Sequence, residues 1–126
     1  MTVFPPLVIG ASGRIGRCLR WRWGAHAALW QARRPQDGPE PGAGWRIFAP
    51  LQDPVALQAA AREAGQILCL AGPVPGRGGD LADSVALGAA AVRAGAAAGG
   101  RVILASSAAV YGAQPGSQAT PLHEDL

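Results

Sequence analysis

Three glycines near the N-terminus, Gly10, Gly13 and Gly16, have a spacing that suits phosphate binding. They follow a short apolar run, residues 7–9, that predicts a buried strand, and they precede a helical segment. The first glycine permits a tight turn, the second lets the backbone approach a pyrophosphate, and the third allows close packing of helix on strand. The helix N-terminus then offers unpaired N–H groups to the phosphates. We therefore predict cofactor contacts along this loop, at Gly10, Ser12, Gly13, Arg14, Ile15 and Gly16.

The spacing of these glycines is GxxGxxG, which differs from the more familiar GxGxxG of dinucleotide-binding proteins. Glycine spacing alone is a weak signal, because a glycine turn can exist without any ligand. The position of the loop directly after the first predicted strand strengthens the prediction considerably.

The end of the second predicted strand bears on which dinucleotide is bound. It reads Gln31-Ala32-Arg33-Arg34 and contains no carboxylate. An acid at this place binds the adenosine ribose hydroxyls and repels a 2′-phosphate, whereas guanidinium groups pair well with phosphate oxygens. We therefore predict NADP as the cofactor through Arg33 and Arg34, with Arg14 as a second contact and NAD as the alternative. A purely solvating role for Arg33 and Arg34 is the competing interpretation.

Apolar runs alternate with helix-forming segments along the chain. The predicted strands span residues 7–9, 27–30, 45–48, 67–71 and 101–106. The predicted helices run over 15–23, from Pro54 to a stop at Gly65, and from Asp80 or Asp83 to Ala98. Strands that alternate with helices form right-handed βαβ units. The sequence thus predicts an α/β fold, a Rossmann-like doubly wound parallel sheet with about five strands in the order 3-2-1-4-5.

Composition and charge restrict the class of protein. Apolar residues make up 49% of the 126 residues and charged residues 15%, so the chain can bury a core and is not intrinsically disordered. All eleven basic residues are arginine, which excludes a P-loop NTPase because that loop requires a lysine. The local excess of arginine over residues 1–34 is compatible with a polyanion site, but we expect Arg17, Arg20 and Arg22 to be solvated and predict no nucleic-acid partner.

Other residue types indicate no further site. Cys18 and Cys69 fall in predicted core elements, so we expect buried, reduced thiols, and His26 and His123 lack metal-ligand spacing. The four tryptophans are expected to pack near the first helix and the second and third strands. No apolar run approaches the roughly 20 residues of a membrane span, and no basic segment opens the chain. We therefore predict a cytoplasmic protein without a membrane partner.

A second motif lies at the end of the fifth predicted strand, over residues 106–112, and reads Ser-Ser-Ala-Ala-Val-Tyr-Gly. Together with the glycine loop it resembles the NAD(P)-dependent epimerase/dehydratase family, the extended or atypical short-chain dehydrogenase/reductases. The resemblance implies that Ser107 is catalytic and hydrogen-bonds the substrate oxygen, and that Ala71 and Gly72 lie against the cofactor. Pro50 departs from the family, since many members have an adenine-contacting acid there. Asp83 or Ser84 stands near the usual asparagine of the family, which is a second departure.

The family's catalytic acid is a tyrosine in a Tyr-x-x-x-Lys pair, and this chain contains no such pair. Its one tyrosine, Tyr111, belongs to the serine motif, and it has no lysine to bind the nicotinamide ribose and lower a tyrosine pKa. We therefore expect residues 1–126 to be one NAD(P)-binding Rossmann domain, truncated before the helix that carries the Tyr-x-x-x-Lys pair in the family. We also expect it to lack a C-terminal substrate subdomain. The resemblance implies hydride transfer at a hydroxyl or carbonyl carbon of a sugar nucleotide or similar substrate, in an epimerase, dehydratase or reductase that this chain does not complete alone.

Two other interpretations stay open. A non-catalytic NADP-binding sensor or regulatory module would use the glycine loop and would not need the Tyr-Lys pair. A prematurely ended product would expose an apolar sheet edge, which predicts low solubility unless the chain forms a homodimer. The intact motif around Ser107 favours the enzyme part, because a pure binder has no use for it.

Overall fold

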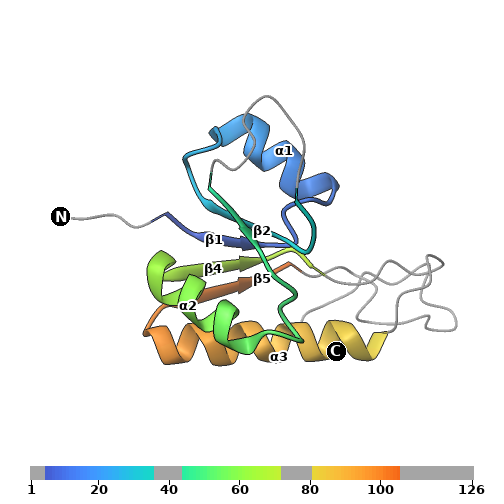
Figure 1. Cartoon of the computed structure of the whole chain (residues 1–126), viewed down its shortest axis with the longest axis vertical. Coiled ribbons are helices and arrows are strands. Elements are labelled where there is room, and N and C mark those ends of the chain that lie inside the picture. Colours follow the sequence, from blue (N-terminus) through green and yellow to red (C-terminus); the bar gives the residue numbers. More distant parts are fainter. Residues whose placement is uncertain (1–4, 36–43, 72–80, 106–126) are drawn as a thin grey trace, which may run out of the picture.

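The computed structural model describes residues 5–35, 44–71 and 81–105, in which strands and helices alternate (Figure 1). The strands of this part of the chain are β1 (Leu7–Ile9), β2 (Leu29–Ala32), β3 (Trp45–Ile47), β4 (Gln66–Cys69) and β5 (Arg101–Leu104). Its helices are α1 (Arg14–Trp23), α2 (Pro54–Ala64) and α3 (Leu81–Ala98). The types and order of these elements agree with the sequence prediction.

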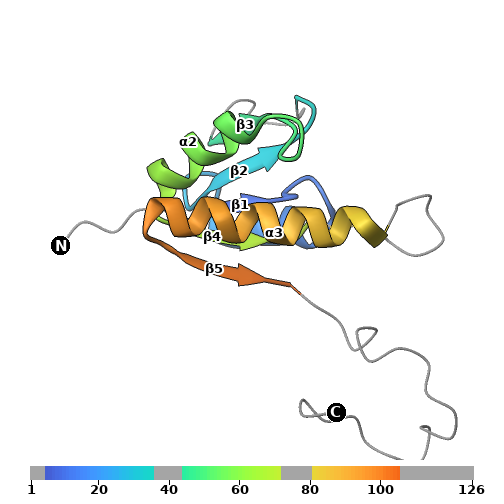
Figure 2. The same cartoon turned by 90° about the horizontal axis from the view of Figure 1, so that it is seen from below.

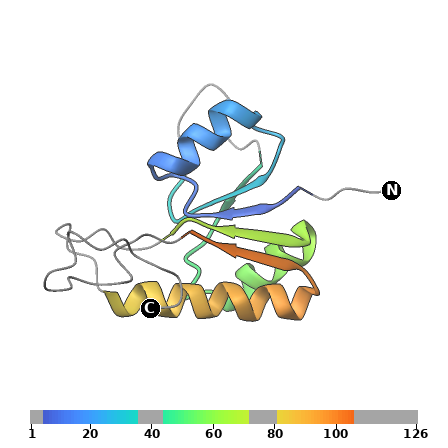
Figure 3. The ribbon, with the colours of Figure 1, turned by 180° about the vertical axis from the view of Figure 1, so that it is seen from behind.

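The strands form one parallel sheet in the order β3-β2-β1-β4-β5, as predicted. β1 is central, with Val8 opposite Trp30 of β2 and Leu68 of β4. Helix α1 covers one face, and α2 and α3 cover the other (Figures 1 and 3). Seen from the side of these two helices, α3 passes in front of β1 and β4, and α2 lies nearer β2 (Figure 2). This is a doubly wound, Rossmann-like α/β fold.

The face beneath α2 and α3 holds the larger hydrophobic core. Alternate residues of β1 and β4 point into it, namely Leu7, Ile9, Ile67 and Cys69. The two helices contribute mainly alanines, together with Leu57. Small side chains let a helix approach the sheet closely, which explains why an alanine-rich, aromatic-poor sequence packs well here. None of the described helices is long and apolar enough to cross a membrane.

Helix α2 begins and ends where the sequence predicts. The Asp53 carboxylate accepts a hydrogen bond from Ala56 N at 3.1 Å, and Pro54 occupies the first turn. Gly65 ends the helix in the left-handed conformation, with φ of 83°. On the surface, Arg46 of β3 pairs with Glu63 near the C-terminal end of α2, at 2.7 Å.

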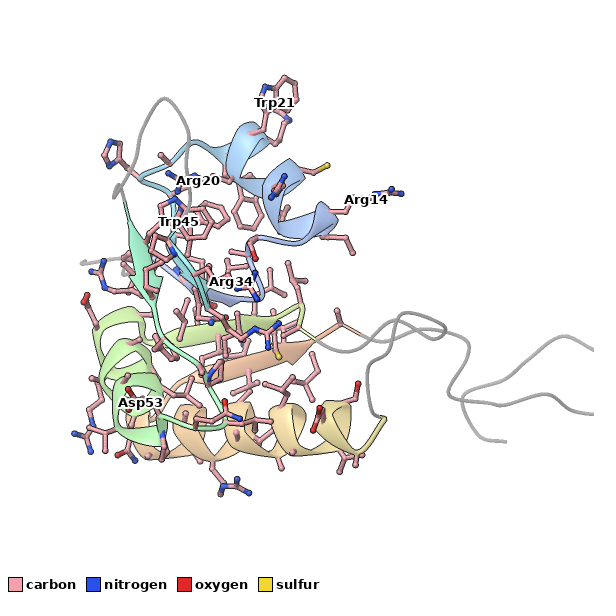
Figure 4. All side chains as sticks on the ribbon, turned by 45° about the vertical axis from the view of Figure 1, so that its right-hand side comes forward. Arg14, Arg20, Trp21, Arg34, Trp45 and Asp53 are labelled. Carbon is pink, nitrogen blue, oxygen red and sulfur yellow. The ribbon has the colours of Figure 1, made fainter. Side chains whose placement is uncertain are left out.

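A smaller core lies beneath α1 and is built around Trp30. Its ring is fully buried, and its Nε1 donates a hydrogen bond to Ala25 O at 2.8 Å. The Arg20 guanidinium lies over two rings, 5.6 Å from the centroid of Trp30 and 4.7 Å from that of Trp45. The prediction that Arg20 is solvated is therefore wrong, because its side chain covers aromatic surface and is held there by cation–π attraction. Figure 4 shows Arg20 and Trp45 together on this side of the sheet.

Two further predictions need correction. Strand β2 begins two residues later than predicted, because Trp30, Gln31 and Ala32 all pair with β3. Strand β4 alternates between half-buried and buried residues. Cys18 is exposed, because it lies on the outward side of α1, whereas Cys69 is buried as predicted.

The tryptophans divide between core and surface. Trp30 and Trp45 pack as expected, but Trp21 is 85% exposed and points away from the protein (Figure 4). Its place on the outward side of α1, opposite the residues that face the sheet, accounts for this exposure. The expectation that it packs against the neighbouring elements is therefore wrong.

Candidate functional site

The carboxyl ends of the parallel strands lie along one edge of the sheet, where the chain leaves β1 and β4 toward opposite faces. The element after β1 is α1, and the element after β4 is α3 on the other face (Figure 1). Ligands of open α/β sheets bind outside the strand ends at such a topological switch point. The glycine loop, Arg33, Arg34 and Ala71 all follow strand ends at this edge.

Two of the three loop glycines are required by the packing of the protein itself. Gly10 has a φ of +80°, and a Cβ there would lie 2.8 Å from Cα of Ala71. A Cβ at Gly16 would lie 2.5 Å from Cα of Ala11. Neither position can take a side chain without displacing backbone. The tight turn predicted for Gly10 and the close packing predicted for Gly16 are therefore confirmed.

Gly13 differs from both, since none of the described residues requires it to be glycine. Its φ of −75° and ψ of 179° are open to any residue, and a Cβ would meet Gly10 O at an ordinary 3.5 Å. It is the N-cap of α1, but the helix has no side-chain cap and no acid in its first turn. The first N–H groups of α1 therefore lack a side-chain acceptor within the described ranges. The positive end of the helix dipole lies at the same place, which makes it a cradle suited to an anion.

The other loop residues predicted to bind a cofactor surround this cradle. Arg14 and Ile15 are exposed, and Figure 4 shows Arg14 extending outward from the start of α1. Ser12 is half-buried, and its carbonyl accepts a hydrogen bond from Arg17 Nε at 2.8 Å. Arg17 is exposed as expected, but this bond holds its side chain against the loop. Its charge therefore adds to the positive potential around the cradle.

The predicted residues outside the loop are only partly brought together. Arg33 and Arg34 directly follow β2 and are exposed, but Arg34 lies well apart from Arg14 in Figure 4. Ala71 lies directly against Gly10, and Leu70 N donates to Ile9 O at 2.9 Å, which joins the ends of β1 and β4. Gly72, Ser107 and the rest of the serine motif lie outside the described residues.

Titratable groups give no sign of a second reactive centre in the described ranges. Burial raises the pKa of the Cys69 thiol, and a hydrogen bond with the backbone of Ala71 lowers it by a smaller amount. The thiol is thus neutral near neutral pH and is a poor nucleophile. Within the described residues, no three His, Cys, Asp or Glu side chains come together in a group that could hold a metal ion.

Sequence reasoning missed the part that Gln31 plays at this edge. Its side chain is 2% exposed, and its Oε1 accepts a hydrogen bond from Gly10 N at 2.9 Å. The sequence places this residue only within the segment Gln31-Ala32-Arg33-Arg34 that bears on the choice of cofactor. A polar residue inside an otherwise apolar strand was the signal that could have found it, because a buried amide needs partners.

Comparison with known proteins identifies related structures. No protein-family model matches the chain, and no functionally curated protein matches it either. Among solved structures, uronate dehydrogenase from Agrobacterium tumefaciens is 28% identical with a TM-score of 0.55, over 85% of this chain and 42% of that one. A mutant of the same enzyme complexed with NAD is 27% identical, with a TM-score of 0.56 over 84% of this chain and 42% of that one.

A third structure, a mutated uronate dehydrogenase, is 25% identical with a TM-score of 0.57, over 86% of this chain and 41% of the other. The chain thus spans about 42% of the length of the first of these dehydrogenases. It is a Rossmann-like α/β domain, similar over most of its length to part of a dehydrogenase of known structure.

Proposed function

We propose that this domain binds a nicotinamide dinucleotide, with the pyrophosphate at the N-terminus of α1. The observation that carries the proposal is the contrast within the glycine loop. Packing requires glycine at Gly10 and Gly16, whereas at Gly13 a side chain would meet only an ordinary contact among the described residues, beside N–H groups of α1 that no described side chain caps. Because a pyrophosphate is an anion that needs several N–H donors and close backbone approach, it suits this cradle.

The similar dehydrogenases support the class of reaction. One of them is complexed with NAD, and the matched region covers most of this chain. We propose that the domain is the cofactor-binding part of an oxidoreductase of the NAD(P)-dependent epimerase/dehydratase type. A bound nicotinamide supplies hydride transfer, and the substrate we propose is a sugar nucleotide or a similar hydroxyl or carbonyl compound.

Each of the site residues has a separate role in binding the dinucleotide. Gly10 and Gly16 set the path of the loop, and the first N–H groups of α1 bind the pyrophosphate near Gly13. Arg33 and Arg34 would bind the 2′-phosphate of NADP, because they are exposed at the carboxyl end of β2 and no acid stands beside them in the sequence. Arg14 extends from the start of α1 and would add a contact to phosphate.

We further propose that Ser107 hydrogen-bonds the substrate oxygen and that residues 1–126 form one domain that does not turn over substrate alone. The support for the second point is that Tyr111 is the one tyrosine of these 126 residues and that lysine is absent. Arginine cannot replace a titrating lysine, because it stays protonated in proteins. The same absence favours the alternative function, a dinucleotide-binding regulatory module.

Titration calorimetry of the 126-residue chain with NADPH and with NADH tests the proposal. We expect micromolar binding, with NADPH preferred by about tenfold, which corresponds to about 1.4 kcal/mol. Changing both Arg33 and Arg34 to Ala should remove the preference while NADH binding is kept. Arg93→Ala, at an exposed arginine of α3, is the matched control and should change neither. No heat with either dinucleotide would contradict the function itself.

The reading frame beyond residue 126 and the activity of the protein it encodes distinguish an enzyme from a regulatory module. If extending the reading frame past Leu126 yields a Tyr-x-x-x-Lys segment and the longer protein reduces a carbonyl substrate with NADPH, the enzyme is supported. A longer protein that binds NADPH without any turnover supports the regulatory module.

A further inference from the structure

Gln31 is the one buried polar side chain among the described residues. It sits in β2 and points to the same face as Leu29, which belongs to the core beneath α2 and α3. An amide in such a place needs partners at both of its ends, because a buried polar group without a hydrogen-bond partner destabilises the folded protein. Both ends are paired here. Oε1 accepts from Gly10 N at 2.9 Å, and Nε2 donates to Phe48 O at 2.7 Å.

The backbone of Gln31 makes a third contact with the glycine loop. Its carbonyl oxygen accepts a hydrogen bond from Ala11 N at 2.9 Å. The N–H of Gly10 belongs to the peptide that precedes this glycine, and the N–H of Ala11 belongs to the peptide that follows it. A single residue of β2 therefore holds both peptides that flank Gly10, one through its side chain and one through its backbone. Together they fix the two dihedral angles of Gly10.

The fixed peptide leads directly to the proposed phosphate cradle. The carbonyl of Gly10 accepts a hydrogen bond from Gly13 N at 3.3 Å, and Gly13 is the N-cap of α1. The chain of contacts thus runs from Gln31 to Gly10 and from Gly10 to Gly13. The other end of the Gln31 amide, Nε2, donates to the carbonyl oxygen of Phe48, the residue after β3. Hydrogen bonds of Gln31 therefore connect the carboxyl ends of β1, β2 and β3.

We propose that Gln31 is a positioning residue of the dinucleotide site, whose side-chain amide sets the Gly10 peptide and thereby the position of the phosphate-binding N–H groups of α1. This inference rests on the proposed function. Gln31 itself contacts no phosphate in this arrangement, since its amide is buried and both ends are engaged. Its effect on affinity comes through the conformation of the loop.

Two variants separate positioning from simple support of the fold. Gln31→Leu has a similar size but makes neither hydrogen bond. Gln31→Glu keeps an acceptor for Gly10 N and, when ionised, places a carboxylate oxygen against the Phe48 carbonyl oxygen, which is repulsive. When protonated, the introduced carboxyl donates to Phe48 O and accepts from Gly10 N, so both bonds return. Burial and the facing carbonyl raise the pKa of the introduced carboxyl, so protonation should begin well above the usual range of a glutamate.

Charged neighbours of position 31 do not cancel the rise in pKa expected for the carboxyl introduced by Gln31→Glu. Arg46 lies opposite Gln31 in the register of β2 and β3, but its guanidinium is bound by Glu63 at 2.7 Å and by Trp45 O at 3.3 Å. Arg33 and Arg34 directly follow β2 and are exposed to solvent, where screening weakens the effect of their charges on position 31. The described part of β1 carries no titratable side chain.

The experiment measures NADPH affinity by calorimetry at about pH 8 and about pH 5.5, with unfolding curves to correct for the folded fraction. For Gln31→Leu we expect affinity at least about tenfold below wild type at both pH values. For Gln31→Glu we expect a similar loss at the higher pH and recovery to within about threefold of wild type at the lower one. A purely structural role would change the unfolding curves with pH but leave the affinity of the folded protein at the wild-type value, and that result overturns the inference.

The outcomes also distinguish the inference from the function on which it rests. If the wild-type chain does not bind NADPH or NADH, the proposed function fails. If the wild type binds and folded Gln31→Leu binds equally well, only the positioning role fails. Should neither variant fold, NMR of the wild-type chain decides, because the Gly10 amide and the Gln31 side-chain amide must shift together during an NADPH titration. Resonances that stay unchanged while NADPH binds overturn the inference.

Discussion

Helices α1 and α2 are of similar length, 10 and 11 residues, but they begin in opposite ways. The Asp53 side chain caps α2, and Pro54 removes one N–H that would otherwise need an acceptor. Helix α1 begins at Gly13 with no side-chain cap, no acid in its first turn and an arginine as its first residue. A side chain of the protein caps the start of α2, whereas the start of α1 has no side-chain acceptor among the described residues.

The difference shows that the protein gives up helix stability at the start of α1. An N-cap such as Asp contributes about 0.5–2 kcal/mol relative to Ala, and an acidic first turn adds more through the helix dipole. Because Gly13 has an extended backbone and a Cβ there would make only an ordinary contact with the described residues, a capping residue would fit without backbone strain. A helix start that gives up available stability is the expected mark of a binding site. The comparison can be tested by changing each terminus in turn.

The largest expected effect concerns the glycine that holds α1 against the sheet. Gly16→Ala should lower the free energy of unfolding by about 3 kcal/mol or more, because the new methyl group meets the backbone of Ala11 and neither can move easily. Urea unfolding followed by tryptophan fluorescence measures this. Gly13→Ala is the matched control, and its effect should stay within about 1 kcal/mol. Equal losses for the two variants would show that Gly13 is also required by packing.

The next effect separates binding from stability at the start of α1. Gly13→Asp should weaken NADPH binding at least about 100-fold, or about 2.7 kcal/mol, because the carboxylate occupies the anion cradle and repels phosphate. The same change should raise the free energy of unfolding without ligand by up to about 1 kcal/mol, since Asp is a good N-cap. Calorimetry measures the NADPH affinity, and urea unfolding of the same preparation measures the free energy of unfolding.

A neutral cap serves as the control for charge. Gly13→Asn caps a helix about as well as Asp but carries no negative charge. It should give a similar gain in stability and a smaller loss of affinity than Gly13→Asp. If both variants bind NADPH like the wild type, the phosphate does not lie at this helix start.

The corresponding change at α2 should affect stability alone. Asp53→Ala removes the bond to Ala56 N and should lower the free energy of unfolding by about 1 kcal/mol. NADPH affinity should stay within experimental error, because Asp53 lies well apart from Arg14 at the start of α1 (Figure 4). Asp53→Asn keeps an acceptor and should recover most of the loss. A change in affinity that follows stability in these variants would mean that the two helix starts are coupled.

The sequence was informative wherever local chemistry decides the structure. The glycine spacing, the Asp53-Pro54 helix start and the apolar runs predicted the element order and the strand order correctly. These signals are local, because a cap or a turn depends on neighbouring residues. The start of β2 was misplaced by two residues, since pairing with β3 and not composition determines it.

Long-range contacts account for the remaining errors. Arg20 looks solvated in the sequence, and only the fold brings Trp45 from a distant segment beneath its guanidinium. The role of Gln31 likewise depends on partners that lie 21 residues before it and 17 residues after it. Such partners follow from the register of strands, which no local pattern in a single sequence specifies.

The smallest expected effect compares the two helical layers through their cysteines. Cys18 is exposed on α1 and should react with a thiol reagent within the mixing time of an ordinary assay, whereas Cys69 lies in the core beneath α2 and α3 and should react only as fast as the protein opens.

Burial raises the pKa of the Cys69 thiol above its ordinary value of 9.0, so the folded state binds this proton more tightly than the unfolded state does. Below that value the thiol is neutral in both states and contributes no pH dependence. Above it the unfolded chain ionises first, and stability falls as pH rises. Cys69→Ala should abolish this alkaline loss while Cys18→Ala should not, and a loss of the same size in both variants would assign it to another group.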